Sequence, residues 1–336
     1  MTHSTPHSAS RRRLLAAGAA LPIAALLPPA SHAAGYPEKP IRIVIPFASG
    51  GTADIVARLL ANKLTERLGQ PVVVDARAGA NGIIGADGVA KAAPDGYTLL
   101  LHSSAHAINA SLYKKLPFDT LRYFTPVAPV VAPGVFVVVV NPSLPVNNIP
   151  ELLAYAKAHP DTVSYGSAGI GNGLHLAGEM LAQMGGVKLL HVPYKGAAPI
   201  LNDLVGNQIQ MMFNSPLAVQ GFVKDKKLRM LAQTGLVRSS ALPDLPTVAE
   251  SGLPGFEVTS WYGLYAPANT PAPIVQRLNA ETIWAMNQPD VQERLASLGT
   301  AALPPTTPAQ FGEFTRSEIA RYASVIRKAN LSLDVV

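Results

Sequence analysis

Two glycine-rich turns carry the residue types that could bind an anion. The first runs from Ser49 through Gly50 and Gly51 to Thr52, between an apolar strand-like run and a helical run. The second, in VSYGSAGIGNGLHLAGEML, repeats that order of apolar run, glycine-rich turn and helical run. The first backbone N–H groups of a helix lack partners within the helix, and the helix dipole is positive there. Each turn therefore predicts an anion site built from backbone donors, with no requirement for Arg or Lys.

A nucleotide phosphate is the first anion to test, and the spacing argues against it. Gly166 to Gly171 satisfies the two glycines of a P-loop, but Asn172 and Gly173 stand where Lys and Ser or Thr should follow. In RAGANGIIGADG the glycines do not fall as G-x-G-x-x-G. The composition also excludes nucleic acid, because charged residues are only 14% of the chain and the basic ones are dispersed.

The sequence contains only incomplete motifs for catalysis and for metal binding. Ser111 and Lys114 match S-x-x-K, but neither S-D-N nor K-T-G accompanies them. Asp54 has the side chain of a general base, but the favoured interpretation is that it accepts hydrogen bonds from backbone N–H groups at the start of a helix. His102 and His106 are four residues apart, as two metal ligands on a helix would be, but no H-E-x-x-H or nearby third ligand accompanies them. We expect no enzyme, no cofactor and no metal, and we expect both histidines to be hydrogen-bonding groups in a loop.

The N-terminus has the organisation of an export signal. Ser10-Arg11-Arg12-Arg13 precedes an apolar run from Leu14 to Leu27, and the small-x-small site Ser31-His32-Ala33 follows. The sequence therefore predicts a signal peptide at 1–33 and a periplasmic protein, exported by a twin-arginine or a Sec signal. With no Cys, the chain offers no lipid anchor site, no disulfide and no thiolate zinc site. Without the three signal arginines, 24 Lys and Arg oppose 21 Asp and Glu, which leaves a net charge of +3.

Alternating strand-like and helical segments predict two α/β domains. IRIVIP, PVVVDA and YTLLLHSS are strand-like, and helical patterns at 52–68 and 82–93 separate them. The alternation recurs after Pro142, where Asn148-Ile149-Pro150-Glu151 fits a capping box with proline in the first turn. Near the C-terminus, Thr307-Pro308-Ala309-Gln310 fits another capping box. A mature chain of about 300 residues is long enough to favour two domains over one core. Parallel pairing is implied in both domains.

Two long apolar segments are the expected crossings between the domains. They are GVFVVVVNPSLP at 134–145 and FEVTSWYGLYAPANTP at 256–271. If the chain leaves domain 1 at the first and returns at the second, domain 1 comprises 34–136 and 258–336, and domain 2 comprises 137–257. In open α/β sheets, ligands bind at the carboxyl ends of the strands, so both glycine-rich turns would face one cleft.

Several phrases of the sequence together resemble one protein family. YPEKPIRIVIPFASGGTADIVARLL, YGSAGIGNGLHLAGEML, HVPYKGAAPILNDLVGNQIQMMF and ALPDLPTVAESGLPGFEVTSWYGLYAPANTP resemble the substrate-binding proteins of tripartite tricarboxylate transporters, the Bug family. The resemblance covers nearly the whole mature chain. It implies an α/β, two-lobed Venus-flytrap fold of type II-like topology, with two mixed or parallel sheets and two crossover strands. It also implies capture of a small carboxylate by main-chain amides, small hydroxyl groups and ordered waters, and delivery to a permease with a small and a large subunit. We expect a monomer.

The resemblance and the turns together give a set of candidate ligand-binding residues. In the first domain they are Phe47, Ser49, Gly50, Gly51, Thr52, Asp54, His102, Ser103 and Ser104. In the second domain they are Ser167, Ala168, Gly169, Ile170, Asn172, Asn214 and Ser215.

Two departures from the family pattern bear on ligand choice. Family members commonly carry two prolines where this chain has Ala48 and Ser49, and Asp where it has Asn214. An Asp in the cleft would favour a ligand ammonium group, whereas a neutral Asn would not. The resemblance therefore predicts a carboxylate without an amine: a dicarboxylate, a hydroxy acid or an aromatic acid. A ligand-sensing receptor for a membrane signalling protein and an exported hydrolase using Ser111 or Ser167 are the alternatives.

Overall fold

A computed structural model describes residues 1–3, 35–47, 49–50, 52–167, 169–194, 197–239, 241–297, 300–328 and 332. Apart from residues 1–3, the expected signal peptide at 1–33 lies outside the described residues, as do Ala48, Gly51 and Ala168. No helix in the described ranges is both long and apolar enough to span a bilayer. Residues 37–336 contain two five-stranded sheets within one unit.

The first sheet has the strand order β2-β1-β3-β10-β4. β1 lies between β2 and β3 and is parallel to both, and β10 runs antiparallel between β3 and β4. The strands are β1 (Ile41–Ile45), β2 (Val72–Ala76), β3 (Thr98–Ser103), β4 (Phe124–Val135) and β10 (Thr259–Pro267). The helical segments of this part of the chain are α1 (Thr52–Leu68), η1 (Ala80–Gly82), α2 (Ile83–Ala90), α3 (Ala105–Leu112), α8 (Ala272–Met286), α9 (Pro289–Ser297) and α10 (Pro308–Lys328).

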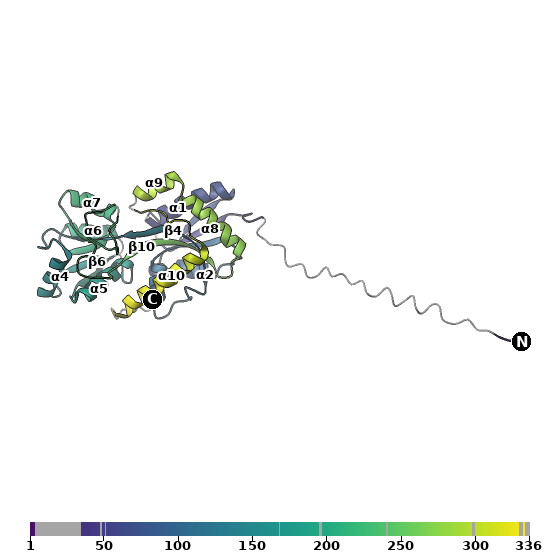
Figure 1. Cartoon of the computed structure of the whole chain (residues 1–336), viewed down its shortest axis with the longest axis horizontal. Helices are drawn as coiled ribbons and strands as arrows, with labels where there is room; N and C mark the ends of the chain where they lie inside the picture. Colours follow the sequence, from purple (N-terminus) through teal and green to yellow (C-terminus); the bar gives the residue numbers. More distant parts are fainter. Residues whose placement is uncertain are drawn as a thin grey trace. The chain divides into compact units, whose positions relative to one another are not determined.

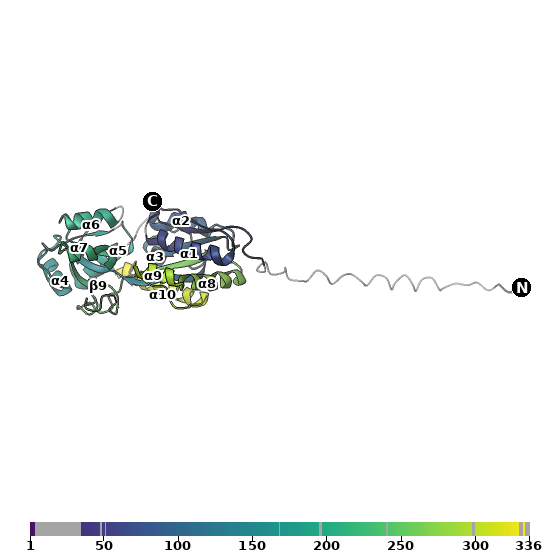
Figure 2. The same cartoon turned by 90° about the horizontal axis from the view of Figure 1, so that it is seen from above.

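The second sheet repeats this arrangement in the order β7-β6-β8-β5-β9. β6 is parallel to β7 and β8, and β5 runs antiparallel between β8 and β9. The strands are β5 (Val137–Val140), β6 (Ser164–Ser167), β7 (Leu190–Pro193), β8 (Met211–Asn214) and β9 (Arg229–Gln233). The helices are α4 (Ile149–Ala158), α5 (Gly173–Gly185), α6 (Ala197–Val205) and α7 (Pro216–Lys224), which gather around this sheet in Figure 2.

The chain crosses between the two sheets twice. β4 ends at Val135 and β5 begins at Val137, so Phe136 alone separates a strand of the first sheet from a strand of the second. After β9, residues 234–258 lead back to β10, which pairs with β4 along most of its length (Figure 1). The expected fold class, two mixed α/β sheets joined by two crossings, is confirmed. The domain boundaries drawn from the sequence stay a prediction.

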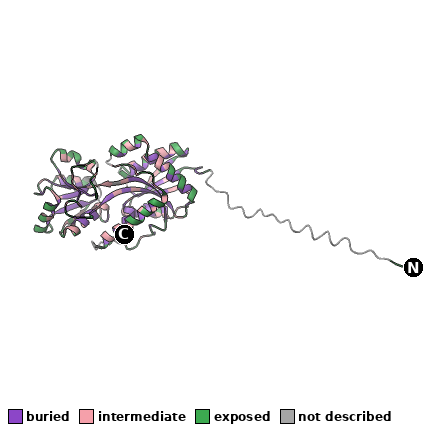
Figure 3. Cartoon of the chain, in the orientation of Figure 1, coloured by how far each residue is buried: buried purple, intermediate pink, exposed green. Residues whose placement is uncertain are grey.

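The valine run of β5 shows why this segment is a central strand. Val138 and Val140 pack into one buried cluster with helices α4 and α5, and Val137 and Val139 pack into another with α6 and α7. Successive side chains of a strand point to opposite faces, so a continuous apolar run fits a strand that is covered on both faces. Figure 3 shows the same layering, with buried strands inside and exposed residues on the outer faces of the helices.

Two helix starts that the sequence marks as capping boxes are confirmed. Asn148 Oδ1 accepts from the Glu151 N–H at 2.9 Å, and the Glu151 carboxylate accepts from the Asn147 N–H at 2.7 Å. At α10, Thr307 Oγ1 accepts from the Gln310 N–H at 3.2 Å, and Gln310 Oε1 accepts from the Thr307 N–H at 2.9 Å. Each box satisfies backbone donors that the helix itself leaves without partners.

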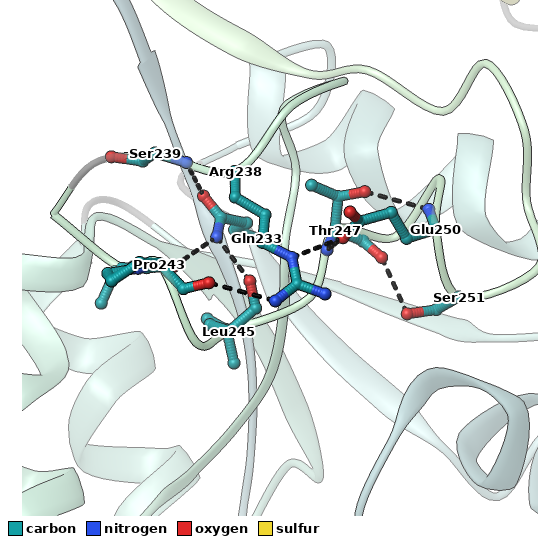
Figure 4. Close-up of polar contacts among 9 residues, drawn as sticks. Gln233, Arg238, Ser239, Pro243, Leu245, Thr247, Glu250 and Ser251 are labelled. Carbon is teal, nitrogen blue, oxygen red and sulfur yellow. Dashed lines mark hydrogen bonds and ion pairs between the residues drawn. The ribbon is translucent and has the colours of Figure 1, made fainter.

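The return connection at 234–258 is held against the second sheet by polar contacts (Figure 4). The buried Gln233 amide donates to the carbonyls of Leu242 and Leu245 at 2.9 and 2.6 Å, and its oxygen accepts from the Ser239 N–H at 2.7 Å. Arg238 pairs with Glu250 at 2.9 Å. These bonds attach the described part of the connection to the end of β9 and give its Leu242 and Leu245 carbonyls partners.

Thr234 joins the two crossings to each other. Its hydroxyl donates to the Val258 carbonyl at 2.6 Å and accepts from the Phe136 N–H at 2.9 Å. The backbone adds bonds from Thr234 N to Phe136 O and from Val258 N to Thr234 O, at 2.9 and 3.0 Å. Thr234 is fully buried, so the hydroxyl serves the two crossing segments and not solvent.

Candidate functional site

Two neighbouring cavities lie where the crossing strands meet both sheets. The larger, of about 420 Å³, is lined from both sheets, and the smaller has about 180 Å³. Both are lined by Phe136, Ser260 and Tyr262, which come from the first crossing and from β10. These shared residues make the two cavities parts of one cleft, with the crossing segments along its wall.

Helix N-termini open onto the cleft from both sheets. Ser104 and Ala105 of α3 and Asn172, Gly173 and Leu174 of α5 line the larger cavity. Thr52 of α1 and Ser215, the N-cap of α7, line the smaller one. Unpaired N–H groups at such ends favour a negative charge, each end by roughly 0.3 to 2 kcal/mol. The cleft therefore collects the N-termini of four helices, whose dipoles favour an anion. The N–H groups of Ser104 and Ser215 already have acceptors, in the Trp261 carbonyl and Asn214 Oδ1.

Not all of these donors are available, because Asn172 caps its own helix. Its Oδ1 accepts from the Leu174 N–H at 2.8 Å and from the His175 N–H at 3.2 Å. The Gly173 N–H has no acceptor among the described residues, so it is the donor that α5 can give to a ligand. The sequence predicted this turn as an anion site, but it could not show that the capping side chain competes for the same donors.

The described lining of the two cavities contains no charged side chain. Its polar groups are hydroxyls, carboxamides and backbone amides, set among apolar residues such as Phe47 and Phe136. Neutral donors in a partly shielded cleft form strong hydrogen bonds with an ionised acceptor, about 1.5 to 3 kcal/mol each. The arrangement suits a small anion with apolar parts.

The predicted residues divide into three groups by position. Seven line the cavities: Phe47, Ser103, Ser104 and Asn172 in the larger, and Thr52, Asn214 and Ser215 in the smaller. Seven others line neither of these cavities: Ser49, Gly50, Asp54, His102, Ser167, Gly169 and Ile170. Gly51 and Ala168 lie outside the described residues.

Asp54 has the structural role that the sequence favoured. One carboxylate oxygen accepts from the Gly50 N–H at 3.0 Å, and the other lies 3.0 Å from Arg58. The Arg58 hydrogen bond, followed by the Gly50 N–H, lowers the pKa of Asp54 below its usual value. Gly50 has φ +87°, a conformation that suits glycine. Asp54, as an ionised acceptor, thus holds the Gly50 backbone of the first glycine-rich turn in place.

Ser167 lies inside the second sheet, where its hydroxyl already has two partners. It is fully buried, donates to the Gly169 carbonyl at 3.0 Å and lies 2.6 Å from His191 Nε2. The His191 ring stacks on His175 with ring centroids 4.0 Å apart. With its donor role used internally and no exposed surface, Ser167 is poorly placed as a nucleophile. The nearby histidines, which the sequence analysis did not single out, lie on α5 and β7.

The expectation for His102 and His106 was wrong. His102 lies near the end of β3 and His106 in the first turn of α3, so they are neither a helical i,i+4 pair nor loop residues. Their rings stack with centroids 4.9 Å apart in a buried aromatic cluster. Both ring nitrogens of His102 and Nε2 of His106 have no hydrogen-bond partner among the described residues. In the described part of the chain, no group of three potential ligands could hold a metal ion.

Burial shifts the titration of these imidazoles. Desolvation lowers the pKa of His102 well below its usual value and that of His106 to about 3. Desolvation also lowers the pKa of His175 and of His191 to about 4. Removing a cationic imidazolium from water is unfavourable, so these four residues, the shielded histidines, are neutral at pH 7.

The structure adds cleft residues that the sequence analysis missed. Besides Phe136, Ser260 and Tyr262, Asn81 lines the larger cavity. Its amide donates to Asn109 Oδ1 at 2.8 Å and to the Gly171 carbonyl at 3.1 Å, which links η1 to the turn before α5. Ser260 and Tyr262 stand two apart in a strand-like segment, so they share a face. That spacing was the available signal, but the sequence does not say which face meets the cleft.

Comparisons with known proteins find one matching family and several similar solved structures. A family model described as "Tripartite tricarboxylate transporter family receptor" matches residues 56–331. The solved structure of the periplasmic binding protein BugD is 39% identical, with a TM-score of 0.77 over 88% of this chain and 99% of its own. Rpa4515 of R. palustris with adipate is 35% identical, with a TM-score of 0.78 over 88% and 99%. MatC of Rhodopseudomonas palustris with bound malate is 33% identical, with a TM-score of 0.77 over 87% and 100%.

The comparisons bear on two expectations from the sequence. The resemblance to the Bug family is confirmed by the family match and by BugD. A match to a receptor family also confirms that the chain is a binding protein rather than an enzyme. This outcome excludes the hydrolase alternative.

Proposed function

The chain belongs to the tripartite tricarboxylate transporter receptor family, and we propose that it captures a small carboxylate without an amino group in the cleft between its two sheets. The ligand class is a dicarboxylate, a hydroxy acid or an aromatic acid. The receptor works in the periplasm as a monomer and passes its ligand to a membrane permease with a small and a large subunit. The predicted signal peptide and the description of BugD as a periplasmic binding protein support this location.

One observation carries the proposal: a cleft lined by neutral donors at helix N-termini, without a charged side chain in its described lining. Such a cleft binds a carboxylate through hydrogen bonds to the ionised group. Three or four such bonds, at about 1.5 to 3 kcal/mol each, approach the roughly −8 kcal/mol of micromolar binding before ordering costs. The two relatives solved with adipate and with malate hold ligands of this chemical type.

Asn214 supports the choice of an amine-free ligand. It is buried at 8% exposure and lines the smaller cavity. Its Oδ1 accepts from the Ser215 N–H at 2.8 Å, while its amide nitrogen has only Met212 Sδ, at 4.0 Å. The amide N–H groups are therefore available to an acceptor on the ligand. A ligand ammonium would meet these donors and no carboxylate in the described lining.

Calorimetric titration of the mature protein tests the proposal directly. The panel contains succinate, malate, adipate and benzoate as amine-free acids, and aspartate and glutamate as amino acids of similar size. We expect tight binding of at least one amine-free acid and a raised thermal midpoint, since a ligand at 100 times its Kd adds about 2.7 kcal/mol of stability. Tight binding of aspartate or glutamate with none of the amine-free acids would contradict the proposal.

A matched pair of variants isolates the role of Asn214. Asn214→Asp places a carboxylate in the smaller cavity, so it should weaken amine-free acids at least tenfold and improve aspartate or glutamate. Asn202→Asp makes the same charge change at an exposed position of α6 and should leave the preference unchanged. Equal effects of the two substitutions would show that net charge, and not the cleft, sets the preference.

A further inference from the structure

Tyr262 has an unusual position in the cleft. It lines both cavities, so it lies at their junction. Ser260, two residues earlier on β10, also lines both. Neither belongs to the two glycine-rich turns, and both lie on a strand that connects the sheets.

An irregularity in β10 sets the direction of this side chain. The register between β10 and β4 shifts between Ser260 and Tyr262 and again between Tyr262 and Gly263. Register irregularities of this kind bend a strand and re-aim side chains, and they are common beside functional sites. Trp261 is fully buried and donates from Nε1 to Glu318 of α10, on the opposite face. The alternation along β10 therefore sends Trp261 toward α10 and Tyr262 toward the cleft.

The space behind Tyr262 fixes this arrangement. A Cβ atom on Gly263 would lie 2.2 Å from the Phe311 ring, so α10 packs directly against the backbone here. On the other side, Tyr262 pairs with Ser103 of β3, which lines the larger cavity. If the two faces of β10 were exchanged, Tyr262 would be driven into the packing against α10.

The Tyr262 hydroxyl is a donor without a protein acceptor. No hydrogen bond of this hydroxyl is found within the described ranges, although a half-buried tyrosine normally finds a partner. Burial raises the pKa of Tyr262 to about 12, so the phenol keeps its proton at neutral pH. A protonated phenol in a cleft with neutral walls is suited to donate to an anionic oxygen.

We infer that Tyr262 is a ligand-binding residue of the receptor, whose hydroxyl donates a hydrogen bond to a carboxylate oxygen at the junction of the two cavities. The Ser260 hydroxyl, on the same face of β10, contributes a second bond. This inference rests on the proposed function. It places part of the recognition on the crossing strand itself, in addition to the turns at the ends of the sheets.

Two conservative variants test the inference. Tyr262→Phe removes the hydroxyl and keeps the ring, so the affinity for succinate, malate, adipate or benzoate, whichever the wild-type protein binds, should fall at least fivefold. Tyr123→Phe makes the same change at an exposed tyrosine outside the cleft and should bind like the wild type. Thermal midpoints without ligand should agree for the three proteins, which separates lost contact from lost folding.

The outcomes distinguish this inference from the proposed function. If the wild-type protein binds an acid of the panel and Tyr262→Phe binds it equally well, only the role of Tyr262 is wrong. If Tyr262→Phe and Tyr123→Phe lose affinity to the same extent, the role of Tyr262 is again wrong. If the wild-type protein binds none of the acids, the proposed function and this inference fall together. A selective loss in Tyr262→Phe supports the assignment, and a further loss in Ser260→Ala supports the second bond.

Discussion

Replacing Thr234 by Val should destabilise the protein more than replacing it by Ser. Thr234→Val keeps the shape of the side chain but removes the hydroxyl that joins the two crossings. The Val258 carbonyl then loses its 2.6 Å bond, and the Phe136 N–H loses its 2.9 Å acceptor. Thr234→Ser keeps both bonds and removes one methyl group.

The magnitudes follow from the partners that each substitution leaves behind. A buried polar group without a partner costs about 1 to 3 kcal/mol, so two such groups predict a loss of about 2 to 6 kcal/mol for Thr234→Val. Loss of one buried methyl group costs about 1 kcal/mol. The remaining bonds, from Thr234 N to Phe136 O and from Val258 N to Thr234 O, survive in both variants. The serine variant should therefore be the more stable by about 1 to 5 kcal/mol.

Urea unfolding measures this difference. Trp261, which is fully buried near the second crossing, reports local unfolding by fluorescence, and circular dichroism reports the whole fold. If the two probes agree, unfolding is two-state and has a single free energy. If the dependence of that free energy on urea concentration is unchanged, the midpoint shift is a change in stability. If Thr234→Val proves as stable as Thr234→Ser, the hydroxyl does not hold the crossings together and the reasoning is refuted.

Two further predictions concern packing and pH. Gly178→Ala should cost about 1 to 3 kcal/mol in urea unfolding despite the better helix propensity of Ala, because the new Cβ would lie 2.1 Å from the Tyr165 ring. Gly221→Ala, also within a helix but with open space around the new Cβ, should instead raise the free energy of unfolding by about 0.5 to 1 kcal/mol. A rise in both variants would show that the Tyr165 ring moves aside at no cost. The shielded histidines bind protons more readily when unfolded, so stability should fall as the pH drops from about 6.5 toward 4. His106→Leu should reduce the loss of unfolding free energy between pH 7.5 and 5 by about 2 kcal/mol, as measured by urea unfolding. His159→Gln, at an exposed histidine, should leave that loss unchanged. An equal pH dependence of stability in the two variants would count against burial as the cause.

The sequence was most informative where short-range rules decide the structure. The helix expected at 52–68 is α1, and the boxes at Asn148 and Thr307 cap their helices. The valine run of β5 is buried on both faces, as a continuous apolar run predicts. Periodicity and capping act within a few residues, so they can be read without knowledge of the rest of the fold. The export pattern and the family resemblance likewise come from the sequence alone.

Only the tertiary structure decided which polar groups face the cleft and which have internal partners. Ser167 was expected in a turn that suits a ligand, but it ends β6, and His191, 24 residues later, lies 2.6 Å from its hydroxyl. His102 looked like a loop residue, but it lies buried against His106. Tyr262 carried no sequence signal beyond its alternation with Trp261. In each case the competing partner comes from another element, and the choice between burial and a cleft position depends on long-range packing that no local pattern encodes.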